Sequence, residues 1–129
     1  MKFLQAVKLW MPVIVWMSVI FWLSSIPGLH ITEGLLDFIF RKLAHIGEFA
    51  LLTILIARAH QGSFEFSLDS TPIRWAMVIA LLYAVSDEVH QSFVPNRGPS
   101  PVDVLIDAIG IASTALFWSR RPGFLRLKK

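Results

Sequence analysis

Polar and charged side chains lie at one end of three of the four long apolar segments in this chain. Residues 9–28 contain no charged residue, which satisfies the length that a helix needs to cross a bilayer. The other segments run over about residues 38–57, 73–93 and 102–118, and each reaches that length only if its polar end is included. Because a charge at membrane depth is costly unless it faces a partner or a wet cavity, we expect these polar ends to face one another.

The composition favours a membrane protein. Of the 129 residues, 55% are hydrophobic and 16% are charged, whereas soluble domains are about 45–50% apolar and about 25% charged. A soluble four-helix bundle is the alternative, but it would need solvated faces that residues 50–57 and 76–85 do not offer. We therefore predict an all-α fold, a four-span transmembrane helical bundle that forms a single domain over residues 1–129. Trp22, Trp75 and Trp118 are expected in the interfacial aromatic belts.

The distribution of basic residues predicts the orientation in the membrane. With the N-terminus in the cytoplasm, nine of the twelve basic residues lie on the cytoplasmic side, namely Lys2, Lys8, Arg58, Arg74, Arg120, Arg121, Arg126, Lys128 and Lys129. The positive-inside rule favours this arrangement over its reverse. Both termini are then cytoplasmic, residues 119–129 form a basic cytoplasmic tail, and the polar ends lie at the outer leaflet of the membrane. The basic residues flank apolar spans, so nucleic acid is not an expected partner.

Helical geometry aligns the polar residues into three strips. At about 100° per residue, Arg41, His45 and Glu48 share one face, with Lys42 beside them. Asp87 and Gln91 share a face of the next segment, with Glu88 at its edge. On the last segment Asp103, Asp107, Gly110 and Thr114 form one stripe, in which the small residues permit close helix approach. Between these segments, Ser100, Pro101 and Asp103 resemble a helix N-terminus with a capping box, and a proline-rich connector holds Arg97 above the acids.

The three polar strips also carry a family resemblance. They comprise the block from Arg41 to Phe49, the block Ser86-Asp87-Glu88-Val89-His90-Gln91-Ser92-Phe93-Val94-Pro95-Asn96-Arg97, and the block Asp103-Val104-Leu105-Ile106-Asp107 with Gly110. In this combination and order, over residues 38–118, the chain resembles the VanZ-like family of small bacterial membrane proteins. Many relatives have Asn where this chain has Asp107. The resemblance implies a multi-pass membrane location and a link to glycopeptide (teicoplanin-type) resistance, without an established mechanism.

The cluster suggests a site for an anionic component of the cell envelope, such as a phospholipid headgroup or a lipid-linked precursor. Guanidinium and ammonium groups suit phosphate, so Arg41, Lys42 and Arg97 are predicted to bind substrate, together with Gln91, Asp103 and Asp107. Proton-transfer or orienting roles are predicted for His45, Glu48, Asp87 and Glu88. The sequence contains no cysteine and identifies no nucleophile with its own base, so it leaves open whether the protein is an enzyme.

Other interpretations remain open. His45 and Glu48 could contribute to a metal site, but an internal salt-bridge network is favoured because the three nearby basic side chains would compete for the carboxylates; we expect no metal and no cofactor. A small transporter or flippase would also place ionisable groups within the membrane. In a third hypothesis the charged network only locks the bundle of a structural or regulatory membrane protein. The oligomeric state is not determined by the sequence.

Overall fold

The computed structural model describes residues 3–29, 34–63 and 71–120. The predicted cytoplasmic positions of Lys2 and of the basic residues from Arg121 onward lie outside this part of the chain. Within it, four helices and no strands are present: α1 (Phe3–Ser24), α2 (Gly34–Ser63), α3 (Thr71–Gln91) and α4 (Pro101–Arg120). The predicted all-α fold is therefore confirmed.

The helices differ from the predicted segments mainly at their ends. α1 begins at Phe3 and ends at Ser24, so Lys8 lies inside the helix rather than before it. α2 has 30 residues, a length of about 45 Å at 1.5 Å per residue, and it carries Arg58 inside its last turns. α4 extends to Arg120, which had been assigned to the tail. Sequence hydropathy marks where apolar character ends, whereas a helix continues as long as its backbone is hydrogen-bonded.

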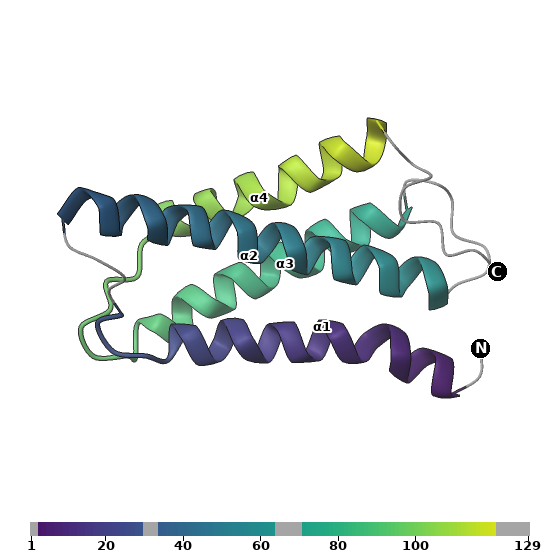
Figure 1. The fold of residues 1–129 in the computed structure, drawn as a ribbon, viewed down its shortest axis with the longest axis horizontal. Coiled ribbons are helices and arrows are strands. Elements are labelled where there is room, and N and C mark those ends of the chain that lie inside the picture. The colour runs from purple at the N-terminus through teal and green to yellow at the C-terminus, as the bar shows by residue number, and fades with distance from the viewer. Residues whose placement is uncertain (1–2, 30–33, 64–70, 121–129) are drawn as a thin grey trace.

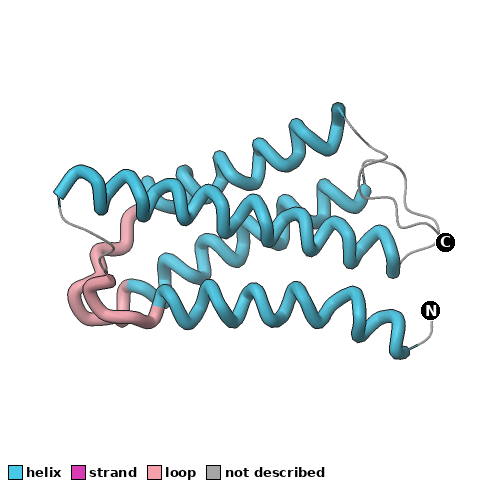
Figure 2. Tube along the Cα trace, in the orientation of Figure 1, coloured by secondary structure: helices cyan, strands magenta, loops and turns pink. Residues whose placement is uncertain are grey.

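The four helices run alternately up and down the bundle (Figures 1 and 2). The end of α1, the start of α2 and the connection from α3 to α4 lie at one end of the bundle, and the start of α1 and the end of α4 lie at the other. α2 packs against each of the other three helices, and α3 also packs against α4. Because the polar ends of α2, α3 and α4 belong to the same end of the bundle, the fold brings the three predicted strips together.

Small residues set the spacing between the helices. At Gly110 on α4, a Cβ atom would collide with the carbonyl oxygen of Ile46 and would lie 3.2 Å from the backbone nitrogen of Ala50. Thr114, one turn further on, donates a hydrogen bond to the Ala50 carbonyl at 3.2 Å. The predicted close approach along the Asp103–Thr114 stripe is therefore confirmed, and the helix facing it is α2.

The apolar side chains divide between a core and an outer surface. Phe49, Leu52 and Ile56 of α2 are fully buried against the other helices. Each helix also exposes large apolar side chains, among them Ile14, Leu43, Leu82 and Leu105. Trp22 and Trp75 are exposed, as expected for belt residues. Trp118 is only 5% exposed and packs in the core, so its prediction as a belt residue was wrong. Burial of a side chain depends on the face of the helix that carries it, not on its distance from the helix end.

Candidate functional site

A cavity of about 370 Å³ opens at the end of the bundle where the polar strips converge. It lies between the end of α1, the first half of α2, the last turn of α3, the connector before α4 and the first turn of α4. Its polar lining includes seven of the ten predicted site residues, namely Arg41, Lys42, His45, Glu48, Gln91, Arg97 and Asp103. The volume is in the range of small-ligand pockets.

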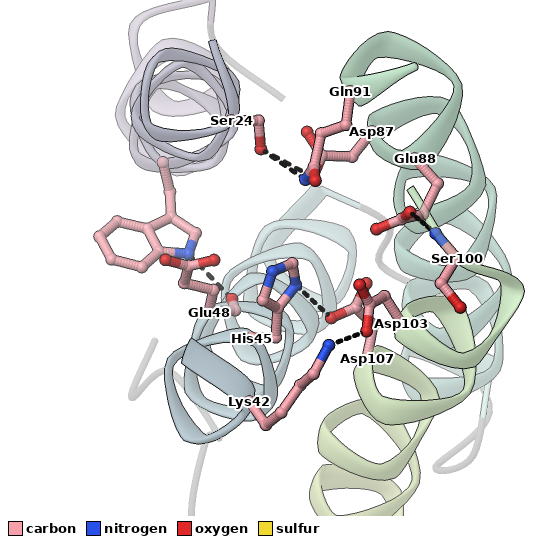
Figure 3. A network of polar contacts seen from close by, with 11 residues as sticks. Ser24, Lys42, His45, Glu48, Asp87, Glu88, Gln91, Ser100, Asp103 and Asp107 are labelled. Carbon is pink, nitrogen blue, oxygen red and sulfur yellow. Dashed lines mark hydrogen bonds and ion pairs between the residues drawn. The ribbon is translucent and has the colours of Figure 1, made fainter. Parts of the chain in front are cut away.

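α2 and α4 are joined across the cavity by two pairs of charged or polar side chains. The Nδ1 atom of His45 lies 2.9 Å from Oδ1 of Asp107, and the Lys42 ammonium forms an ion pair with Asp103. Figure 3 shows both pairs together, with Glu48 on the other side of the His45 ring. Asp107 is 0% exposed and does not line the cavity. It meets the cavity wall through His45, and its substrate-binding role stays a prediction.

The two arginines are held by contacts of their own. Arg41 Nε lies 2.8 Å from Oδ2 of Asp37, one turn earlier on α2. Arg97 donates hydrogen bonds to the carbonyls of Leu23, at 2.6 Å, and Ile26, at 3.1 Å. These carbonyls lie at the end of α1, where a helix has unpaired acceptors and a negative dipole end. Burial lowers the pKa of the Arg97 guanidinium while the Asp87 carboxylate opposes this effect, and an arginine stays protonated at neutral pH.

A second hydrogen-bonded group connects α1 to α3. Ser24 donates a hydrogen bond to Oδ2 of Asp87 at 2.8 Å, and the Gln91 amide donates to the same oxygen at 2.9 Å and to the Ser24 hydroxyl at 3.2 Å (Figure 3). The predicted shared face of Asp87 and Gln91 is confirmed. The participation of Ser24 was missed, because the first apolar segment was interpreted as a plain span; the only sequence signal was a pair of serines near its end, at positions 24 and 25.

Glu88 caps the start of α4. Its Oε2 atom accepts a hydrogen bond from the backbone amide of Ser100 at 2.9 Å, and the Ser100 hydroxyl accepts one from the amide of Val102 at 3.2 Å. Ser100 is thus the predicted N-cap, but the capping box was wrong. The acid that reaches back to the Ser100 amide is Glu88 of α3 rather than Asp103, because Asp103 pairs with Lys42.

Three buried carboxylates lie behind the cavity wall. Asp87, Glu88 and Asp107 are 3%, 7% and 0% exposed and do not line the cavity. Each has one oxygen without a hydrogen-bond partner among the described residues, namely Asp87 Oδ1, Glu88 Oε1 and Asp107 Oδ2. Across the described part of the chain, no group of three or more His, Asp or Glu side chains has a spacing suited to a metal ion. Among the residues that line the cavity, Arg41, Lys42 and Arg97 are basic and Glu48 and Asp103 are acidic, and Arg41 is also paired with Asp37 outside the lining.

Two helices, Phe3–Ser24 and Pro101–Arg120, are long and apolar enough to cross a membrane. Together with the exposed apolar side chains, they suggest a helical protein that associates with a membrane. The VanZ/LLP1 family model matches residues 9–125 of the chain. The protein therefore belongs to the VanZ/LLP1 family, and the match extends beyond the predicted 38–118 to include α1. No curated protein and no solved structure is significantly similar to the chain.

Proposed function

We propose that this protein is a four-span membrane protein that binds the phosphate-bearing headgroup of an anionic envelope lipid in the cavity. The observation that carries the proposal is the cavity itself, whose lining gathers Arg41, Lys42 and Arg97 from two different segments of the chain. Phosphate is recognised in proteins by such charge-assisted hydrogen bonds. The lipid class is either a phospholipid or a polyprenyl-linked cell-wall precursor.

The proposed orientation puts this end of the bundle at the outer leaflet of the bacterial inner membrane. Lys8, Arg58, Arg74 and Arg120 all belong to the opposite end, which the positive-inside rule assigns to the cytoplasm. The exposed apolar side chains of all four helices then face lipid, and the acyl chains of a bound lipid lie along that same surface. In this orientation, the basic residues that follow Arg120 in the sequence belong to a cytoplasmic tail at the inner leaflet.

The proposal is tested by lipid binding to the purified protein. Native mass spectrometry in a mild detergent should show adducts with dioleoyl phosphatidic acid or farnesyl diphosphate, and far fewer with zwitterionic dioleoyl phosphatidylcholine. The double variant Arg41→Gln, Lys42→Gln should lose these adducts. A matched control is Arg58→Gln, Arg74→Gln, which removes two positive charges at the other end of the bundle. Equal binding of anionic and zwitterionic lipids would reject the proposal.

A second candidate is a structural or regulatory role in which the charged network locks the bundle. It is favoured by the ion pairs of Arg41 with Asp37 and of Lys42 with Asp103, and by the contacts of Arg97 with α1. This role predicts that cellular phenotype and detergent stability fall together when Arg97 and Glu88 are replaced. Loss of an envelope-antibiotic phenotype without loss of stability would favour lipid binding. A transporter has less support, since the cavity lining comes from one end of the bundle.

A further inference from the structure

The imidazole ring of His45 is held in place by a buried carboxylate. Its Nδ1 atom is paired with Asp107 at 2.9 Å, and Asp107 is completely buried. His45 lines the cavity, and its Nε2 atom has no partner among the described residues. A carboxylate on Nδ1 fixes the ring orientation and keeps the proton on that nitrogen, so Nε2 presents its lone pair. This is the arrangement of a histidine general base.

We propose that the His45–Asp107 pair makes the cavity a hydrolytic site for a terminal phosphate on a lipid, a lipid phosphomonoester or diphosphate. This inference rests on the proposed binding of such a headgroup. The three positive side chains that bind the phosphate are the groups needed to offset the charge on its oxygens during transfer, because phosphoryl transfer depends chiefly on positioning and electrostatic stabilisation. In this reaction His45 is a catalytic residue and Asp107 is a positioning residue.

The reaction uses one water molecule from the solvent. As the water oxygen bonds to the terminal phosphorus, Nε2 of His45 takes one of its protons. The bond between phosphorus and the oxygen on the lipid side breaks on the opposite side of the phosphorus atom; that leaving oxygen takes a proton from solvent water, and Nε2 then releases its proton to solvent. The products are inorganic phosphate and a lipid with one phosphate fewer. His45 returns to its starting state, no electrons are transferred to or from the protein, and Asp107 stays ionised throughout.

Other groups around the imidazole are consistent with these roles. Glu48 of α2 interacts electrostatically with His45 and lines the cavity, so it can orient the attacking water. From α4, Asp103 also acts on His45, but it is paired with Lys42. Glu88 of α3 lies within electrostatic range of His45 and is bonded to the Ser100 amide. His45 is therefore a cavity residue whose proton acceptor, Nε2, is oriented by a second side chain, Asp107.

The test measures release of inorganic phosphate from dioleoyl phosphatidic acid and from farnesyl diphosphate by the purified full-length protein. Adduct formation with the same lipids is measured in parallel by native mass spectrometry. His45→Gln should lower kcat by about 100-fold or more, the contribution typical of a general base, while lipid adducts persist. Asp107→Asn should lower kcat with little change in KM. His60→Gln, at the far end of the same helix, is the matched control and should retain the wild-type rate. The lipid that is hydrolysed identifies the source of the phosphate.

Each outcome decides between the two proposals. Lipid adducts without phosphate release by the wild type would overturn the hydrolytic inference and leave the binding proposal in place. Phosphate release that is equal in His45→Gln would indicate another phosphatase in the preparation and would also overturn it. Absence of adducts with either anionic lipid would overturn the binding proposal, and the inference with it. If His45→Gln unfolds, His45→Ala tested with added imidazole replaces it, and the inference fails if imidazole restores no activity to a folded protein.

Discussion

The carboxylate of Glu88, at the end of α3, accepts the backbone hydrogen bond of Ser100, at the start of α4, over 2.9 Å. This contact joins the end of α3 to the N-terminus of α4 across the connector. It also explains why Asp103 is available to Lys42 of α2. The Glu88 carboxylate thus contributes to the position of the first turn of α4, which carries Asp103.

Replacement of Glu88 should weaken this end of the bundle. Glu88→Ala removes the acceptor of the Ser100 amide, and loss of a helix cap costs about 0.5–2 kcal/mol. Glu88→Gln keeps a carbonyl oxygen that can accept the same hydrogen bond. The stability lost in this variant should therefore be smaller than in Glu88→Ala. Thermal unfolding in detergent measures both, and equal melting temperatures for the two variants would contradict the capping role.

Gly110→Ala should separate α2 from α4. The added methyl group would collide with the Ile46 carbonyl, and overpacking of this kind typically costs about 1–3 kcal/mol. Gly47→Ala is the matched control, because a Cβ there meets nothing within 4 Å and alanine favours a helix over glycine by about 1 kcal/mol. The free energy of unfolding should therefore fall for Gly110→Ala and rise for Gly47→Ala. An unchanged free energy of unfolding for Gly110→Ala would exclude the tight contact.

The Lys42–Asp103 ion pair should contribute measurable coupling between α2 and α4. The Asp103 side chain is nearly buried, while that of Lys42 is about one-quarter exposed. Lys42→Met should therefore lower the free energy of unfolding by on the order of 1–3 kcal/mol, between the values for exposed and buried ion pairs. The double variant Lys42→Met, Asp103→Asn should recover part of this loss, because no charge is then left unpaired. A double-mutant cycle gives the coupling energy, and strictly additive losses would show that the pair contributes nothing.

Arg97→Lys should be a poor replacement despite retaining the positive charge. The guanidinium bonds two carbonyls at the end of α1 through two different nitrogens, and a lysine ammonium lacks that planar geometry. We expect lower thermal stability, with about 1 kcal/mol lost for each hydrogen bond that lysine cannot remake. Hydrogen exchange at the start of the connector after Ser24 should accelerate. An unchanged exchange rate there would show that the hydrogen bonds from Arg97 do not stabilise the end of α1. The role of Arg97 would then be confined to the cavity.

The orientation in the membrane can be tested by labelling single cysteines, since the natural chain has none. A cysteine at Pro99, which is exposed at the cavity end, should react with a membrane-impermeant maleimide in intact cells. A cysteine at Arg120, at the other end of the bundle, should react only after permeabilisation. The reverse pattern would place the cavity at the cytoplasmic side and reject the positive-inside assignment.

Much of the fold and part of the site follow from local sequence. Hydrophobic segments of helical length predict four helices, and the spacing of Asp103, Asp107, Gly110 and Thr114 predicts their common face, since helical periodicity depends only on sequence separation. Partners were harder to predict. Asp103 was expected to cap its own helix, but its pairing with Lys42, like that of Asp107 with His45, depends on distances between helices.

The sequence by itself determined which side chains lie at the same end of the bundle, because that depends on segment order and helical period alone. Only the tertiary structure decided which of them line the cavity and which lie behind it. Arg41 and His45 face the cavity, whereas Asp87 and Asp107 are buried in helix contacts. The physical reason is that burial depends on how far each helix is rotated about its axis, and that rotation is set by contacts such as the one between Gly110 and Ile46.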